Sequence, residues 1–233
     1  MTLSMPGYIP TAVAGSPITY EWDDSNPEKM YLRPDEKLRN RINDSTESGV
    51  VAISLGFAEW IAWRLRSHGD DLMLLRYIEA CWAGLIDWRY VSKQNRPNPL
   101  WTEWKGPIRG PICGACKMLK EIASLASRKQ PSSPESVCLS RIAEHVVPDP
   151  RAFKHWRQSA IQRMVRVYPR STEDLFGRPI PREALEPNFV YEPDQAAHLL
   201  ARFVQGLDHK SNPYLSSPLE MRERGFQGDP YPA

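Results

Sequence analysis

The fold is decided by the stretch from residue 46 to residue 90, which reads TESGVVAISLGFAEWIAWRLRSHGDDLMLLRYIEACWAGLIDWRY. Its first part is predicted to form a helix from about Val50 to Arg66, capped by Thr46 or Ser45. At 100° per residue the apolar side chains of this helix fall almost all the way round. A helix of this kind has to be enclosed by other helices. The stretch therefore predicts the central helix of a bundle.

The second part of the stretch predicts a neighbour for that helix. Asp70 or Asp71 can cap a helix that runs to about Tyr90. Its apolar residues share about half of the helical wheel: Leu74, Leu75, Tyr77, Ile78, Cys81, Trp82, Leu85, Ile86 and Trp88. His68 and Gly69 end the preceding helix, so we expect the two helices to form an antiparallel hairpin.

Proline placement divides the chain into three parts. The 233 residues include 22 prolines, a share nearly twice the usual value of about 5%. Prolines are frequent near both ends and absent between residues 35 and 96. We therefore predict an N-terminal arm over residues 1–34, a helical domain over 35–206 and a C-terminal strap over 207–233.

Helix start and stop signals complete the fold prediction. Four further helices are expected: from near Pro111 to about Arg128, from Ser133 to before Pro148, from Pro150 to Tyr168, and from Pro193 to Gln205. Three stretches look strand-like but are short: Ile18–Trp22, Met30–Leu32 and Phe189–Tyr191. The predicted fold is all-α, a single irregular bundle of about six or seven helices with an extended arm and tail.

The tail is too apolar for a disordered linker. Aromatic and large aliphatic residues recur along it every few positions, and its prolines prevent a long helix. We expect one short helical turn from Ser217 to Arg222, ended by Gly225. The rest is predicted to lie extended across the helical body, as is the arm around Tyr20 and Trp22.

Composition limits the partners and the compartment. The formal net charge is +2, so no overall field favours nucleic acid or anionic lipid. The most apolar stretch has 14 residues and contains Glu59, whereas a membrane-spanning helix needs roughly 20. Four cysteines are too few for a disulfide scaffold. We therefore expect a cytoplasmic protein without a membrane partner.

The pair Cys113-Gly-Ala-Cys116 is the sharpest local motif. At the start of a helix, free amide groups and the helix dipole would lower the pKa of the first thiol. The wheel also places Cys113 beside Lys117 and Lys120, on the face expected to be wet. However, thioredoxin-like motifs follow a strand, and this one follows a proline-rich loop. Close packing of two small residues is the favoured interpretation.

Zinc binding is the other use of this motif. Cys138 and His145 lie seven positions apart on one helical stripe, so Cys113, Cys116, Cys138 and His145 could supply four tetrahedral ligands. Strong zinc signatures contain two close pairs, and this chain has one. Cys138 also continues an apolar stripe, which favours a place in the core.

Two groups of residues suggest binding surfaces. Residues 151–170 contain six Lys or Arg and no acid. Three of these, Arg163, Arg166 and Arg170, share one side of the wheel. They could contact nucleic-acid phosphates, an acidic protein partner or the chain's own acidic residues 21–28; an ordinary solvated helix face is the plainest interpretation.

The second group lies on a proline-bounded loop. Trp101 and Trp104, with Arg109 close behind, have the composition of a protein-binding hot spot. The alternative is a loop that folds back and plugs the bundle. Two acidic residues, Glu59 and Glu79, lie on apolar helices, where burial could raise the pKa of each carboxyl group. The favoured interpretation is that each lies at a helix edge and pairs with an arginine, as Glu79 could with Arg76.

The sequence contains no convergent set of acid, base, nucleophile or metal ligands. We therefore predict a non-enzymatic protein–protein interaction module that needs no cofactor. Its most concrete form is a bacterial immunity-type or adaptor protein that binds and masks a toxin or an enzyme. The alternatives are a thiol- or zinc-dependent protein using Cys113 and Cys116, and a nucleic-acid binder using the basic helix at 151–170.

Overall fold

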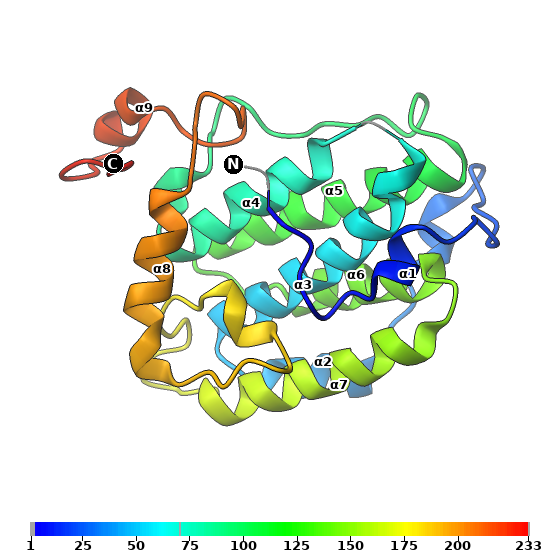
Figure 1. Cartoon of the computed structure of the whole chain (residues 1–233), viewed down its shortest axis with the longest axis horizontal. Helices are drawn as coiled ribbons and strands as arrows, with labels where there is room; N and C mark the ends of the chain where they lie inside the picture. The colour runs from blue at the N-terminus through cyan, green and yellow to red at the C-terminus, as the bar shows by residue number, and fades with distance from the viewer. Residues whose placement is uncertain (1–2, 70, 233) are drawn as a thin grey trace.

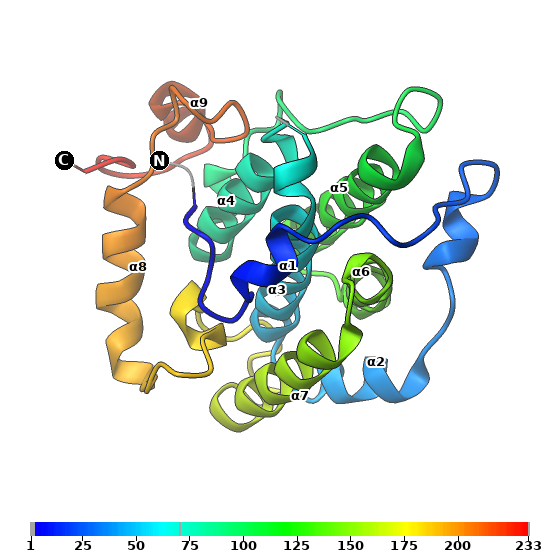
Figure 2. The same cartoon turned by 45° about the vertical axis from the view of Figure 1, so that its right-hand side comes forward.

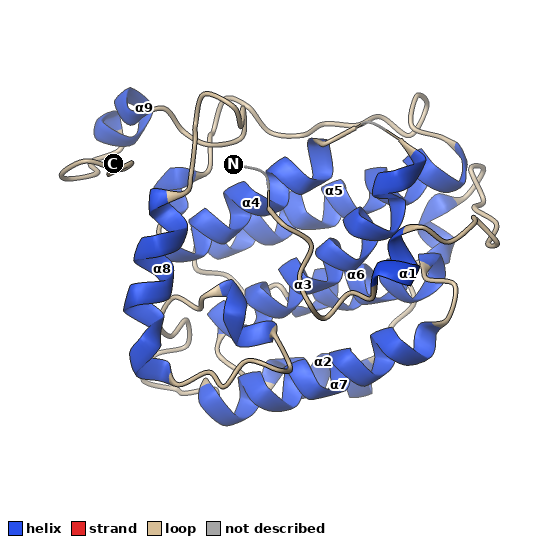
Figure 3. Cartoon of the chain, viewed as in Figure 1, coloured by secondary structure: helices blue, strands red, loops and turns tan. Residues whose placement is uncertain are grey.

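The computed structural model describes residues 3–69 and 71–232, and these residues form helices and loops without a strand (Figures 1 and 3). The all-α prediction is confirmed, and the three strand-like stretches form no strand. The α-helices are α1 Thr11–Ala14, α2 Glu36–Asn43, α3 Glu47–Leu65, α4 Met73–Ile86, α5 Gly106–Ser127, α6 Ser133–Val146, α7 Pro150–Val167, α8 Ala196–Gln205 and α9 Pro218–Glu223. Short 3₁₀ helices span Pro27–Met30, Arg66–His68, Trp88–Tyr90, Arg182–Leu185 and Pro193–Gln195. Of the helices in these two ranges, none is long and apolar enough to cross a bilayer.

Helix α3 lies at the centre of the bundle (Figure 2) and contacts α1, α2, α4, α5, α6 and α7. Of its 19 residues, 17 are buried, as the all-round apolar pattern predicts. The Thr46 hydroxyl accepts a hydrogen bond from the Gly49 amide at 3.3 Å, so the expected cap is present. Gly56 allows close packing of α7, because a Cβ there would lie 2.7 Å from the Trp156 ring.

Helix α4 is shorter than predicted. It ends at Ile86, and a separate 3₁₀ helix begins at Trp88 because Asp87 adopts an extended conformation, with φ −157°. The Asp87 carboxylate then accepts the Arg89 amide at 2.9 Å. At the other end, Asp71 accepts the Met73 amide at 2.6 Å. Asp70, the other cap candidate, lies outside the described residues.

Helix α5 begins at Gly106, five residues before the predicted start at Pro111. A proline inside a helix leaves the carbonyl four residues earlier without its N–H donor. That carbonyl belongs to Pro107, and it accepts a hydrogen bond from the Tyr20 hydroxyl in the N-terminal arm. The tertiary contact replaces the missing helical bond, so the proline does not end the helix.

A buried carboxylate joins four segments at the centre of the molecule. Glu59 of α3 is fully buried. Its oxygens accept hydrogen bonds from Arg182 Nε at 2.8 Å, from Arg182 Nη2 at 3.0 Å and from Trp82 Nε1 at 2.8 Å. The Tyr8 hydroxyl donates to it as well. Glu59 therefore pairs with an arginine, as expected, but in the core rather than at a helix edge.

The arm belongs to the same hydrophobic core as the helices. Tyr8 stacks on Trp156, with 4.5 Å between the ring centroids, and its side chain is buried. Trp22 packs against α5 at Gly110, where a Cβ would lie 2.1 Å from the indole nitrogen. Burial and the Glu59 charge raise the pKa of Tyr8 well above its ordinary value. The arm is thus held by aromatic packing and by polar contacts to α3 and α5.

The tail packs across α4 and the Trp88–Tyr90 turn, as its apolar residues predict. Leu215 and Met221 are buried in a second cluster that includes Tyr90. Arg224 donates hydrogen bonds to three carbonyls around that turn. Glu79 accepts from Asn212 Nδ2 at 2.9 Å and makes no ion pair with Arg76. That part of the Glu79 prediction is wrong, because the tail supplies the polar partner.

We predict that Trp82→Ala lowers the free energy of unfolding by ~3–5 kcal/mol, because it empties a large buried site. The matched variant Trp82→Phe keeps a six-membered ring in the core but removes the hydrogen bond to Glu59 and part of the ring volume, so it should cost about 1–3 kcal/mol, less than the alanine variant. Urea unfolding followed by circular dichroism measures both. An alanine variant that unfolds at the same urea concentration as the parent would contradict the placement of Trp82 in the core.

We also predict that native protein resists trypsin after Lys210, Arg222 and Arg224, because their segment is fixed on α4. Asn212→Ala removes the hydrogen bonds to Glu79 and to the Arg76 carbonyl and should speed cleavage after Lys210. Mass spectrometry of a short digestion gives the order of cleavage. Rapid cleavage of the parent at all three sites would show that the tail is loose.

Candidate functional site

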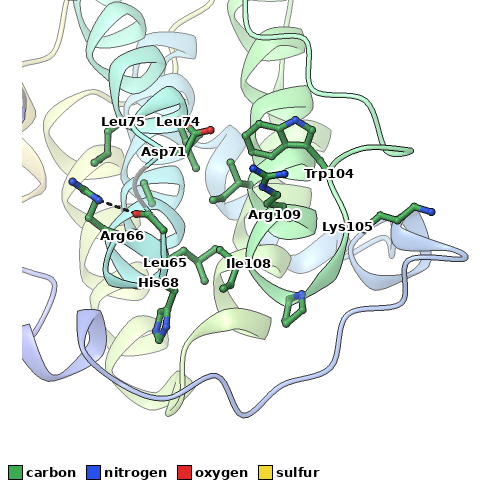
Figure 4. A pocket seen from close by; sticks show the side chains of 14 residues that line it. Leu65, Arg66, His68, Asp71, Leu74, Leu75, Trp104, Lys105, Ile108 and Arg109 are labelled. Carbon is green, nitrogen blue, oxygen red and sulfur yellow. Dashed lines mark hydrogen bonds between the residues drawn. The ribbon is translucent and has the colours of Figure 1, made fainter.

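A cavity of about 570 Å³ opens where the α3–α4 turn faces the start of α5 (Figure 4). This volume lies within the ~300–1,000 Å³ typical of ligand pockets. The cavity is lined by Ala62, Leu65, Arg66, His68, Gly69, Asp71, Leu74, Leu75, Trp104, Lys105, Pro107, Ile108, Arg109 and Ile112.

The floor of the cavity is apolar and built by helical spacing. Leu65 ends α3, Leu74 and Leu75 begin α4, and Ile108 and Ile112 lie one turn apart on α5. Four of these five side chains are buried in the core, and Ile108 is partly buried against it. Neighbouring residues fix each of them, so the floor exists before any ligand arrives.

Trp104 and Arg109 form the α5 side of the cavity. The Arg109 guanidinium carbon lies 5.4 Å from the centre of the Trp104 ring, a cation–π contact. The loop is fixed by hydrogen bonds from the Trp104 amide to Leu100 and from the Gly106 amide to the Asp24 carboxylate, at 2.9 and 2.8 Å. Gly106 has φ +79°, a conformation that favours glycine. The structure thus brings two predicted site residues together.

Trp101 lies apart from this pair. Its ring contacts α5, with the Lys117 ammonium 4.4 Å from the ring centre, and it packs against the hydrophobic core. It does not line the cavity. Both loop tryptophans are half-buried and pack against the core, and Trp104 also lines the cavity.

The opposite side of the cavity comes from the α3–α4 turn. Figure 4 shows Arg66 there, and its guanidinium donates a hydrogen bond to the Gly69 carbonyl at 2.8 Å. Asp71 contributes a negative charge, and its carboxylate is engaged by the Met73 amide. Lys105 extends from the outer edge. Of the described lining residues, Arg66, Lys105 and Arg109 carry positive charge, whereas only Asp71 is acidic.

A buried guanidinium lies behind this turn. Arg64 is fully buried and donates hydrogen bonds to the carbonyls of Ser16, Pro17 and Val146 at 2.7, 2.7 and 3.0 Å. Its Nη1 also lies 3.0 Å from Nε2 of His68, which lines the cavity. The three carbonyl acceptors are uncharged, and Arg64 forms no ion pair within the described chain. Sequence reasoning missed Arg64, since its position on the apolar helix was its only signal.

The predicted arginine ridge on α7 is largely used within the chain. Arg163 donates hydrogen bonds to four carbonyls between Ala184 and Phe189. Arg170 donates to the Asn43 carbonyl at 3.1 Å and lies 3.7 Å from the Glu47 carboxylate. Arg166 is exposed.

The other cations of residues 151–170 are mostly neutralised too. Arg151 pairs with Asp149, whereas Lys154 and Arg157 pair with Glu144. These pairings leave little free charge for nucleic acid. The acidic residues of the arm do not meet the ridge either, because Asp24 caps α5.

The structure agrees with the packing interpretation of Cys113 and Cys116 and disfavours the reactive-thiol alternative. Cys113 lies in the second turn of α5 rather than at its start, and it is fully buried under the loop, with its Sγ 3.6 Å from the Pro99 carbonyl. Burial raises the pKa of Cys113 to about 11, in spite of Lys117 and Lys120. Cys116 is also buried, and burial raises its pKa well above the ordinary value.

The four candidate zinc ligands are not assembled. His145 Nε2 lies 2.7 Å from the Glu21 carbonyl, and Cys113 and Cys116 lie in the core beneath the loop. Within residues 3–69 and 71–232, no three His, Cys, Asp or Glu side chains are arranged to hold a metal ion. Cys138 and His145 both lie on α6, as the helical spacing predicted. His145 contacts the N-terminal arm at Glu21.

Comparison of the chain with models of protein families, with curated proteins and with solved structures finds no match. A function has to be inferred from the chain's own residues.

We predict that Cys138, the half-buried thiol on α6, reacts first with a disulfide reagent such as DTNB at about pH 8. Burial raises the pKa of Cys138 to about 11, so even this reaction should be slow. Cys81, Cys113 and Cys116 should react only after denaturation. Cys138→Ser is the control that should remove the first phase. A fast phase abolished by Cys113→Ser would instead restore the thiol hypothesis.

Proposed function

We propose that this chain is a protein-interaction module whose partner docks at the cavity between the α3–α4 turn and the start of α5. The observation that carries the proposal is Trp104, a loop tryptophan stacked by Arg109 at the edge of a fixed apolar cavity. Tryptophan and arginine are the residues most often found at the energetic centres of protein interfaces.

Rigidity supports a docking role. Among the described residues, the Asp24–Gly106 hydrogen bonds hold the start of α5, and a hydrogen bond joins Arg66 to Gly69 on the opposite side. A partner would therefore bind without paying a large entropy cost for ordering this surface. The apolar floor supplies area that becomes buried when a side chain of the partner enters.

A binding role without catalysis agrees with the state of the ionisable groups. Burial raises the pKa of each of the four thiols above its ordinary value, and Glu59 is held by Arg182, Trp82 and Tyr8. In its most specific form, the proposal is an immunity-type or adaptor protein that masks a toxin or an enzyme. A fixed surface suited to tight, stoichiometric capture supports this form.

The test is co-purification of the tagged full chain from its native cells, followed by mass spectrometry. Trp104→Ala and Arg109→Glu should each weaken recovery of a partner at least about tenfold. Arg222→Glu is the matched charge control: Arg222 is exposed on α9, at the far end of the molecule from the start of α5 (Figure 1). Melting temperatures check that the variants fold.

Recovery of a partner by the parent and by Arg222→Glu, with loss in both cavity variants, would support the proposal. If no stable protein partner is recovered with the parent chain, the proposal fails. A partner that all three variants retain would place the interface elsewhere.

A further inference from the structure

We infer that the cavity accepts an acidic polypeptide segment that inserts one apolar side chain between Trp104 and the α3–α4 turn. The inference rests on the proposed function and adds the chemistry of the partner. Three independent features of the described residues support it: the charges around the cavity, the helix ends that face it, and the buried guanidinium behind it.

Among the described residues that line the cavity, three carry a positive charge and one is acidic. Arg109 and Arg66 stand on opposite sides of the space in Figure 4, and Lys105 extends from its outer edge. The acid facing them, Asp71, already accepts a hydrogen bond from the Met73 amide at 2.6 Å. Since the whole chain carries a net charge of only +2, this concentration of cations is local and favours carboxylates at this site.

Two helices begin at the cavity. The first amides of α4 and of the 22-residue helix α5 have no acceptor within their helices, and each helix dipole adds a positive partial charge there. The chain itself shows that the start of α5 takes a carboxylate, because Asp24 accepts the Gly106 amide at 2.8 and 3.0 Å. Ile108 and Arg109, in the same first turn of α5, are lining residues of the cavity.

The buried Arg64 adds a charge that water cannot screen well. It is fully buried, its hydrogen-bond partners are carbonyls, and it contacts the lining residue His68. In the low dielectric of the interior, the field of such a charge extends further than that of a surface arginine. It therefore disfavours a cationic occupant of the cavity and favours an anionic one.

The apolar residues that line the cavity require an apolar group in the ligand, in addition to its carboxylates. Leu65, Leu74 and Ile112 lie at the bottom of a space of about 570 Å³, which is large enough for an aromatic or branched aliphatic side chain. A peptide whose only contacting groups were carboxylates would leave this apolar surface exposed to water. We therefore expect a segment in which Asp or Glu residues flank a Leu, Ile, Phe or Trp anchor.

The experiment is selection of a phage-displayed random peptide library on the immobilised full chain. Enriched peptides are then synthesised and titrated by fluorescence anisotropy. They should carry more Asp and Glu than Lys and Arg, together with at least one large apolar residue. Arg109→Glu and Trp104→Ala should each raise Kd about tenfold or more, whereas Arg222→Glu should leave it nearly unchanged. Binding should weaken between about 0.1 M and about 1 M salt.

Other outcomes separate this inference from the proposed function. Neutral or basic peptides that need Trp104 but tolerate Arg109→Glu would overturn the acidic preference and leave a protein-binding cavity. If no enriched peptide depends on the cavity, both proposals fail. Decanoate is added as a small anionic amphiphile: thermal stabilisation of the parent but not of Trp104→Ala, without enriched peptides, would make the cavity a small-ligand site and overturn both.

Discussion

The carboxylate of Glu59, buried at the centre of α3, is the interaction on which the rest of the arrangement depends. An ionised group in the core is tolerated only when its charge and its hydrogen-bonding capacity are satisfied. Arg182, Trp82 and Tyr8 satisfy them, and these three residues come from the segment after α7, from α4 and from the N-terminal arm. Burial acts to lower the pKa of Arg182, but the Glu59 charge outweighs it and raises the pKa above its ordinary value. The pair is therefore a fixed ion pair.

Arg64 imposes a second constraint near the end of the same helix. Its guanidinium requires several acceptors, and it finds them in the arm at Ser16 and Pro17 and at the last carbonyl of α6, that of Val146. With Glu59, it ties the arm to α3 at two points. This explains why a proline-rich segment without long helices is ordered and why its aromatic side chains are part of the main core.

The cavity lies close to the contacts of Glu59 and Arg64. The helices around α3 are tied together near Glu59, and the space opens at the C-terminal end of α3, where the α3–α4 turn and the start of α5 meet. Both sides are fixed by hydrogen bonds, and the loop that carries Trp104 is anchored by Asp24 of the arm. The arm thus contributes to the cavity indirectly, by holding the first turn of α5 in place.

Sequence periodicity predicted the parts of the fold that depend on local spacing. The all-round apolar pattern identified α3 as the central helix, and the Ser217-Pro218 pair identified α9, whose cap accepts the Glu220 amide at 3.1 Å. Asp35 and the spacing of Leu38 and Ile42 carried a similar signal for α2, with the Leu38 amide 3.0 Å from Asp35 Oδ1, but this helix was not among those predicted from the sequence. The predicted helix start at Pro111 was wrong, because the Tyr20 hydroxyl donates a hydrogen bond to the Pro107 carbonyl and the helix continues through the proline. The sequence around Pro111 gives no sign of this contact.

The sequence by itself determined the fold class and the central helix, since both follow from residues within a few helical turns of one another. It placed Trp101 and Trp104 near Arg109, and the structure decided that Arg109 contacts Trp104. Only the tertiary structure decided which groups meet across long separations. Glu59 and Arg182 are 123 positions apart in the sequence. Arg163 donates hydrogen bonds to a loop more than 20 residues away. A helical wheel describes one helix at a time, so it predicted that Cys113 lies on a solvent-exposed face of its helix. In the structure, the loop at Pro99 covers that face. The physical reason is that helical hydrogen bonds link residues four positions apart, whereas burial and charge pairing depend on the path of the whole chain.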